Sequence, residues 1–338
     1  VNFDSNVYVL RLLRDNGIHV PNTSRYSLAL YHNHPLVKAL TDYRRYSKLL
    51  SGFLHPLPAQ IHPVTGRLHP KYGQIGAYSG RMCCWGPNIQ QIPREARFRS
   101  CFIAPEGRKL VLADYSQIEL RVAAQISGDV RMKGAYARGE DLHRLTASLI
   151  SDIPAEQVTS AQRQAAKAVN FGIVYGIGAF SLSKDIGVSV KEADAFIKNY
   201  FANFPDVKKY LDETVEQGRE NGYVTTLYGR RRTLPELASS NFNVRSLGER
   251  MAMNTPIQGT AADIIKLAMV RVYRRLKAEG LRARLILQVH DELIVECPAE
   301  EKERAAKVLG EEMRGAAELR VPLSADVNSG TTWYAAKG

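Results

Sequence analysis

Two aspartates stand where apolar runs end, a position from which a carboxylate can do chemistry. Asp114 ends the run LVLAD, and Asp291 follows the run LILQV after a single histidine, His290. Apolar runs of this length predict buried strands, so each aspartate is expected at the end of a strand. If both lie at one edge of a sheet, their mutual repulsion is costly unless a cation binds between them.

Mg²⁺ is the cation that such a pair favours, because it binds carboxylates together with substrate phosphates. Two Mg²⁺ ions about 4 Å apart can stabilise the attacking and leaving oxygens of a phosphoryl displacement. The pair therefore predicts phosphoryl or nucleotidyl transfer. The alternative is two unrelated aspartates at ordinary turns, where this residue type is common. The sequence contains no GxxxxGK[ST] loop, so a triphosphate is not held by a P-loop.

A basic and aromatic stripe follows in the segment RQAAKAVNFGIVYG. Arg163, Lys167, Phe171 and Tyr175 are four residues apart and share one face of a predicted helix. Two cations followed by two rings suit a nucleotide, with phosphates on the charges and the base or sugar against the rings. The alternative is that the charges are solvated and the rings belong to the core.

Composition and charge limit the class of protein. The 338 residues predict more than one domain, and the net charge of +12 favours a polyanionic partner, either nucleic acid or an anionic membrane surface. No apolar run approaches the ~20 residues that span a bilayer. Four cysteines without a CxxC pair argue against a zinc site and a disulfide framework, and they favour a reducing compartment.

The chain order predicts a sheet built from distant segments with a helical insertion between them. The chain begins with Val1 and shows no signal-peptide pattern, so we expect a fragment or a processed product. The expected elements of the first part of the chain are helices over 1–55, short strands around a turn at 61–70 and a strand over 108–115. The expected insertion consists of helices over 116–223, with breaks at Gly128 and Phe204, and a hairpin over 222–235. After it we expect a long helix over 243–280 that is broken or kinked near Pro256, a strand pair around His290, a helix over 300–316 and an irregular end.

Three motifs in this order resemble those of the family A DNA polymerases, the polymerase I-like group. DYSQIELR (114–121) resembles motif A, RQAAKAVNFGIVYG (163–176) resembles motif B and QVHDELIVE (288–296) resembles motif C. The resemblance extends over nearly the whole chain from about His62 onward. Gln164, Cys83 and Cys84 depart from the common pattern, near the nucleotide helix and the primer–template rather than at the chemistry.

The resemblance implies an α+β fold, the right-hand polymerase architecture. It implies a partial helical thumb over 1–56, a palm with an antiparallel sheet over 57–122 and 246–338, and helical fingers over 123–245. The implied activity is template-directed DNA synthesis: deoxynucleoside triphosphates are added to a primer 3′-OH and pyrophosphate is released. No proofreading domain is expected in this chain, which would act as a monomer in the cytoplasm of a bacterial or phage-infected cell or in an organelle matrix.

The resemblance also assigns roles at the site. Asp114 and Asp291 would bind two Mg²⁺ ions, for which Mn²⁺ can substitute, together with the backbone carbonyl of Tyr115. Lys167 would act as a catalytic proton donor to the leaving pyrophosphate, and Glu119 would fill the space of a ribose 2′-OH. The implied nucleotide-binding residues are Arg163, Lys167, Phe171, Tyr175, Gln117, Glu119 and His143, and the implied primer–template contacts are Arg81, Asn88, Gln90, Arg250, Asn254, Gln258 and His290.

Two other functions are consistent with parts of this pattern. A single-subunit RNA polymerase shares the two-carboxylate chemistry, but Glu119 at the 2′-OH position argues against it. A polymerase-like DNA-binding subunit without catalysis is disfavoured because Asp114, Asp291, Arg163 and Lys167 are all present.

Overall fold

The computed structural model describes residues 2–338, so Val1, the first residue of the predicted thumb, lies outside the described residues. The chain forms two compact units. The first unit holds residues 2–71 and 85–88, and the second holds residues 72–84 and 89–338. The first unit extends further along the chain than the thumb predicted to end at residue 56. The division into thumb, palm and fingers stays a prediction.

The first unit is helical, as predicted. It contains α1 (Asn6–Asp15), α2 (Arg25–Ala29), α3 (Pro35–Leu49), the short π-helix η1 (Leu50–Leu54) and α4 (Pro56–Ala59). Ser5 caps α1, because its hydroxyl accepts a hydrogen bond from the Tyr8 amide at 3.4 Å. The helices pack around a small apolar core made of Val9, Leu13, Ile18, Leu28, Val37 and Leu40.

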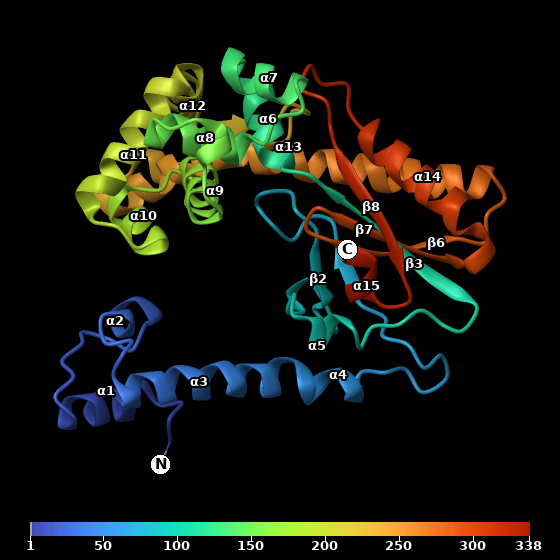
Figure 1. The fold of residues 1–338 in the computed structure, drawn as a ribbon, viewed down its shortest axis with the longest axis horizontal. Coiled ribbons are helices and arrows are strands. Elements are labelled where there is room, and N and C mark those ends of the chain that lie inside the picture. The colour runs from blue at the N-terminus through green and yellow to red at the C-terminus, as the bar shows by residue number, and fades with distance from the viewer. Residues whose placement is uncertain (1) are drawn as a thin grey trace. The chain divides into compact units, whose positions relative to one another are not determined.

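A four-stranded antiparallel sheet lies in the second unit (Figure 1). Its strands are β3 (Arg108–Tyr115), β6 (Arg284–Val289), β7 (Glu292–Pro298) and β8 (Ala325–Gly330), in the order β6-β7-β3-β8. The predicted strands at 108–115 and around His290 are confirmed, and so is the α+β class. The expected irregular end is wrong, because β8 pairs with β3 and is followed by the helix α15 (Trp333–Lys337).

The two faces of the sheet carry different side chains, because successive residues of a strand point to opposite faces. Val111, Ala113 and Tyr115 of β3 share one apolar core with Leu309 and Met313 of α14 (Lys302–Arg314). Asp114 therefore points to the opposite face, where α15 packs against β3 and β8. This alternation leaves the end of β3 with one polar side chain away from the core.

The helical insertion shares the main core with the sheet. The predicted breaks at Gly128 and Phe204 are confirmed, because α6 ends before Gly128 and Phe204 separates two helices. The insertion consists of α6 (Ile118–Ser127), α7 (Val130–Ala137), α8 (Leu142–Ser151), α9 (Ser160–Val174), α10 (Ala179–Ile186), α11 (Val190–Asn203), α12 (Pro205–Asn221) and the hairpin of β4 (Tyr223–Thr225) and β5 (Arg231–Thr233).

Two local predictions need correction. The long helix α13 (Phe242–Ala278) continues through Pro256, which lies buried inside it, so the expected break is wrong, whereas the expected kink stays a prediction. The loss of one backbone hydrogen bond is offset because residues on both sides of Pro256 are packed into the protein. The turn near residue 65 exists, but the short strands β1 (Lys71–Gly73) and β2 (Cys83–Trp85) come after it and do not flank it. Within residues 2–338, no helix combines the length and the apolar character that crossing a membrane requires.

Candidate active site

Asp114 and Asp291 lie at the same end of the central sheet. Asp114 is the penultimate residue of β3, and Asp291 stands in the two-residue turn that joins β6 to β7. The Tyr115 amide donates a hydrogen bond to the Asp291 carbonyl at 3.1 Å, and Asp114 lies opposite Glu292 in the β3–β7 register. The structure thus brings together two carboxylates that are far apart in the sequence.

A buried amide holds the turn that carries Asp291. His290 has a φ of 56°, in the left-handed region that residues with a side chain seldom adopt. The Gln288 side chain donates to the His290 carbonyl at 2.6 Å and accepts from the Gln90 amide at 2.8 Å. The Tyr72 hydroxyl donates to the Gln288 carbonyl at 3.0 Å. Surrounding contacts of this kind maintain a strained conformation at functional sites.

The electrostatics of the site favour a bound cation. Burial, followed by the charge of Asp114, raises the pKa of Asp291 to about 7. Burial also raises the pKa of Asp114, against the effect of Lys337. Asp114 Oδ1 is buried and has no hydrogen-bond partner among residues 2–338. A buried carboxylate oxygen without a donor is a suitable ligand for a hard divalent cation.

The protein alone supplies few ligands for such a cation. Among the described residues, no group of three or more His, Cys, Asp or Glu side chains is arranged to hold a metal ion. A site built on Asp114 and Asp291 therefore needs further ligands from backbone carbonyls, water or a substrate. Mg²⁺ is commonly bound in this way, by one or two carboxylates with substrate phosphates.

Helix α9 carries the basic residues of the stripe. A capping box begins this helix, with Thr159 and Gln162 satisfying each other's backbone amides. Arg163 Nε donates to Asp141 Oδ2 at 2.6 Å, whereas Lys167 is exposed. Burial raises the pKa of Asp141, but the hydrogen bond from Arg163 helps to outweigh this effect, and the net pKa is lowered.

The end of α9 meets the carboxylate of Glu119. The helix ends at Val174, two residues before the end of the motif, and Tyr175 is its C-cap. The Tyr175 hydroxyl donates to one oxygen of the buried Glu119, and Arg81 donates to the other at 2.5 Å. Three predicted site residues from distant segments therefore form one network.

His143 is buried and neutral. The Asn170 side-chain amide donates to His143 Nδ1 at 3.0 Å, and the Thr146 hydroxyl donates to the Asn170 carbonyl oxygen at 3.1 Å. Burial lowers the pKa of His143 to about 4. Because Nδ1 accepts a hydrogen bond, the proton of the neutral ring is on Nε2, which makes Nε2 a donor. The ring centroid lies 5.8 Å from that of Phe171.

A cavity of about 630 Å³ lies beside the end of α9. Phe171, Tyr175 and Arg250 contribute to its lining. Arg250 comes from α13, and Asn254, one turn further along that helix, has a buried side-chain oxygen without a partner in residues 2–338. The third predicted contact on α13, Gln258, is half-buried.

Two predicted residues have a different setting. Gln117 precedes α6 in the left-handed conformation, with a φ of 56°, and its side chain accepts a hydrogen bond from the Tyr136 hydroxyl at 3.1 Å. Asn88 belongs to the first unit and is not placed with the others.

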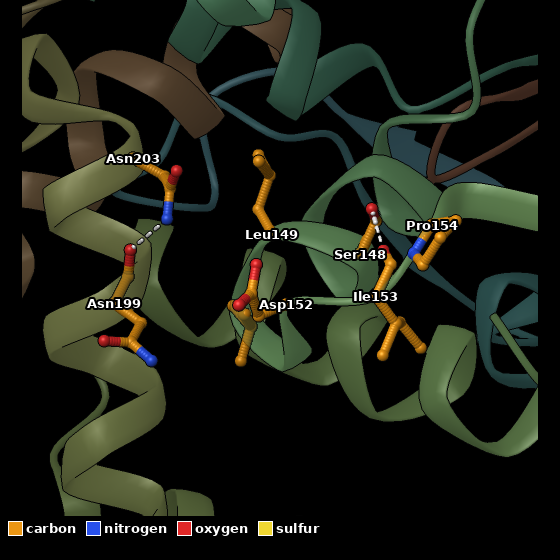
Figure 2. A pocket seen from close by; sticks show the side chains of 8 residues that line it. Ser148, Leu149, Asp152, Ile153, Pro154, Asn199 and Asn203 are labelled. Carbon is orange, nitrogen blue, oxygen red and sulfur yellow. Dashed lines mark hydrogen bonds between the residues drawn. The ribbon is translucent and has the colours of Figure 1, made fainter. Parts of the chain in front are cut away.

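A second cavity lacks the predicted site residues. Figure 2 shows this pocket of about 570 Å³, which Asp152 near the end of α8 and Asn199 and Asn203 of α11 help to line. The Asn203 amide donates to the Asn199 carbonyl at 2.9 Å. Its polar lining is partly engaged within the protein, and Asp152 is the one carboxylate among the lining residues, so this pocket has no carboxylate pair like that at the sheet end.

Comparison with known proteins identifies the family. The family model described as DNA polymerase family A matches residues 13–335, which is nearly the whole chain. The chain belongs to DNA polymerase family A. The predicted resemblance is thereby confirmed, and the sheet-end carboxylates, α9 and the Glu119 network belong to a family A polymerase domain.

The family A relatives are strongly similar over most of this chain. DNA polymerase I of Geobacillus stearothermophilus is 49% identical over 310 residues, which cover 90% of this chain and 35% of that protein. The thermostable DNA polymerase I of Thermus aquaticus is 46% identical over 313 residues, covering 91% of this chain and 37% of that protein. The chain thus spans little more than a third of the length of these curated relatives.

A solved structure has the same fold. The POL domain of Pol1 from M. smegmatis, in complex with DNA primer-template and dNTP, matches with a TM-score of 0.94 and 37% identity. The match covers 100% of this chain and 62% of that chain. The confirmed α+β fold is therefore that of a polymerase I polymerase domain.

Sequence reasoning missed residues that support the site from outside the three motifs. Arg99 and Lys337 both contact Glu292, and Asp141 holds Arg163. Asp141 could have been found as an N-cap, because it precedes an apolar helical pattern. Lys337 follows the sequence TTW, in which Thr332 caps a short helix, but nothing in that segment indicates its partner.

Proposed function

We propose that this chain catalyses template-directed DNA synthesis, transferring a deoxynucleotide to a primer 3′-OH with release of pyrophosphate. The convergence of Asp114 and Asp291 at one end of the sheet carries this proposal. Membership of DNA polymerase family A supports it, and so does the likeness to a polymerase domain in complex with DNA primer-template and dNTP. The right-hand division, with a thumb over 1–56, a palm over 57–122 and 246–338 and fingers over 123–245, is part of the same proposal.

Asp114 and Asp291, with the backbone carbonyl of Tyr115, would hold two Mg²⁺ ions, for which Mn²⁺ can substitute. The free buried oxygen of Asp114 and the crowding of acids fit this role. When bound, the ions lower the pKa of the primer hydroxyl and neutralise charge on the transferring phosphoryl group. The protein's part is to hold both carboxylates at the end of a rigid sheet, so that they are positioned before the substrates bind.

The side chains of α9 would hold the triphosphate. Arg163 and Lys167 offer charge-assisted hydrogen bonds to phosphate oxygens, and the Nε2–H of His143 adds a neutral donor beside them. Lys167 is exposed, so its ammonium is accessible to donate a proton to the leaving pyrophosphate. Phe171, Tyr175 and Gln117 would line the position of the sugar and base.

Glu119 would exclude a ribose 2′-OH. Its carboxylate is fixed by Tyr175 and Arg81, so it cannot move away to admit a larger sugar without breaking both contacts. Primer and template would contact a set of polar side chains, and such contacts read duplex shape rather than sequence. These residues are Arg81, Asn88, Gln90, Arg250, Asn254, Gln258 and His290.

Single-nucleotide extension of a labelled primer tests the proposal. With Mg²⁺, we expect incorporation of the complementary deoxynucleotide only, and discrimination of more than about 100-fold against the matching ribonucleotide. Glu119→Ala should reduce that discrimination while leaving deoxynucleotide addition measurable. Incorporation without regard to the template base would contradict the proposed function, and equal use of both sugars by the unchanged protein would contradict the role of Glu119.

A further inference from the structure

The ammonium group of Lys337 lies between two carboxylates of the site. Its Nζ donates to Asp114 Oδ2 and to Glu292 Oε1. Asp114 comes from β3 and Glu292 from β7, and they lie opposite each other in the antiparallel register. One lysine therefore bridges two neighbouring strands at the position where the acidic side chains gather.

The fold places Lys337 there through the C-terminal helix. Trp333, the first residue of α15, is fully buried, and its backbone amide donates to the Phe102 carbonyl at 2.8 Å. Thr332 caps the helix by accepting from the Ala335 amide at 3.0 Å. The Asn328 side chain of β8 donates to the Lys337 carbonyl at 3.4 Å. Lys337 is therefore anchored by its helix, unlike an ordinary surface lysine.

The two carboxylates differ in what else contacts them. Glu292 also receives a hydrogen bond from the buried Arg99, whose guanidinium stacks on the Trp333 ring at 4.2 Å. Asp114 has only Lys337 as a hydrogen-bond partner for its side chain in the described residues, and its Oδ1 has none. If the Lys337 ammonium leaves Asp114, it can remain bound to Glu292. The Asp114 carboxylate is then available to bind another cation.

We propose that Lys337 is a resident counterion that competes with divalent cations for Asp114 and so sets the metal affinity of the site. This inference rests on the proposed metal-binding role of Asp114. In the metal-free protein the lysine neutralises carboxylates that would otherwise repel one another. When a metal ion binds, it replaces the ammonium on Asp114, while Lys337 keeps its contact with Glu292. Lys337 is thus a positioning residue and takes no part in the bond-making step.

The proposal predicts two effects of opposite sign for Lys337→Met. Removing a positive charge in contact with the site should tighten metal binding, by about tenfold or more. The same change should lower the melting temperature of the metal-free protein, because the carboxylates lose their counterion. A residue that only supported the fold would weaken both properties together.

Mn²⁺ alone serves as the probe, in electron paramagnetic resonance titrations of the DNA-free chain in which the signal of unbound Mn²⁺ is followed. We expect tighter binding by Lys337→Met, binding unchanged by Lys337→Arg, which keeps the charge, and binding unchanged by Lys302→Met on α14 as the matched control. Lys337→Gln is the second variant if the methionine protein does not fold.

Asp114→Asn separates failure of this inference from failure of the proposed function. If Asp114→Asn abolishes Mn²⁺ binding but Lys337→Met binds with equal or weaker affinity than the parent protein, the counterion role is wrong and the metal site stands. If Asp114→Asn binds Mn²⁺ as the parent does, the metal assignment itself is wrong, and the inference that rests on it is overturned with it.

Discussion

At the scale of single residues, Asp141 has two functions that one substitution can separate. Its carboxylate caps α8, accepting from the backbone amide of His143 at 2.9 Å, and it holds Arg163 through Nε. Contact through Nε leaves the two Nη groups of the guanidinium for a ligand. Asp141 therefore orients the residue that we propose to bind the triphosphate.

Asp141→Asn should weaken nucleotide binding without a comparable loss of stability. Asparagine is as good an N-cap as aspartate, but it does not form the ion pair. We expect the apparent Kd for the incoming nucleotide to rise by about threefold to tenfold in single-turnover titrations, with the maximal rate nearly unchanged. Glu140→Gln, which removes an exposed neighbouring carboxylate, is the control. Tighter binding by Asp141→Asn would show that Asp141 competes with the nucleotide instead of orienting Arg163.

His143 should make the folded protein sensitive to acid. The folded protein holds its pKa at about 4, below the ordinary value of about 6.5. Between these values the unfolded chain binds a proton that the folded protein does not, so stability falls as the pH falls. The slope from this residue is at most about 1.4 kcal/mol per pH unit.

Urea unfolding of the parent and of His143→Gln from pH 7 to 4.5 measures this effect. We expect the parent to lose stability faster than the variant on acidification, whereas His32→Gln, at an exposed histidine, should follow the parent. If the free energies of unfolding of the parent and of His143→Gln fall in parallel as the pH is lowered, His143 is protonated in the folded protein as readily as in the unfolded chain.

At the scale of elements, the close approach of α13 to the β4–β5 hairpin depends on Gly259. A methyl group at this position would lie 2.5 Å from the Thr226 methyl carbon and 3.3 Å from the Ser79 carbonyl oxygen. Thr226 cannot give way easily, because it is buried and its hydroxyl is bonded to Asp263 at 2.8 Å. The helix and the hairpin therefore fit together only with glycine at residue 259.

Gly259→Ala should destabilise the protein by about 1–3 kcal/mol, the usual cost of overpacking. Gly52→Ala is the matched control, because nothing lies within 4 Å of a methyl group there. Denaturant unfolding monitored by circular dichroism should show a lower midpoint for Gly259→Ala and an unchanged or slightly higher midpoint for Gly52→Ala. An unchanged midpoint for Gly259→Ala would mean that the hairpin can shift away from α13.

The elements with strong local signals were predictable from the sequence. The apolar runs before Asp114 and Asp291 predicted β3 and β6, and breaks at Gly128 and Phe204 marked helix ends. The edge strand β8 was not predictable in this way, because its sequence ADVNSG contains no apolar run. The break expected at Pro256 is absent from α13, because tertiary packing outweighs a local helix-breaking signal.

The site residues that could be predicted are those that local sequence patterns indicate, whereas contacts between distant segments could not be predicted. Motif spacing indicated Asp114, Arg163, Lys167 and Asp291, whose side chains lie at a strand end, on one helix face or in a turn. The contacts of Lys337 and Arg99 with Glu292 join segments far apart in the chain, and no local pattern reports such pairs. Glu119 and Arg81 were each predicted at the site, but the sequence did not indicate that they form an ion pair.

At the scale of the whole molecule, the net charge of +12 should dominate DNA affinity. Binding releases counterions from the phosphates, so the logarithm of the affinity falls linearly with the logarithm of salt concentration. We expect a slope of about −4 or steeper for a primer–template, corresponding to about five phosphate contacts. Fluorescence anisotropy at about 50 to about 300 mM KCl, roughly a sixfold range of ionic strength, measures it. A flat dependence would mean that the surplus charge does not face the DNA.

The central claim is that Asp114 and Asp291 together bind the divalent ions of nucleotidyl transfer. The most direct measurement is single-turnover nucleotide incorporation by Asp114→Asn and Asp291→Asn, with primer–template affinity determined in parallel. Asp326→Asn is the matched control, because Asp326 lies opposite Asp114 on β8 but is exposed. We predict that each of the first two variants loses incorporation by about 10³-fold or more with DNA affinity nearly unchanged, and that the control stays within about tenfold. Incorporation by Asp114→Asn or Asp291→Asn at a rate close to that of the control would contradict the claim.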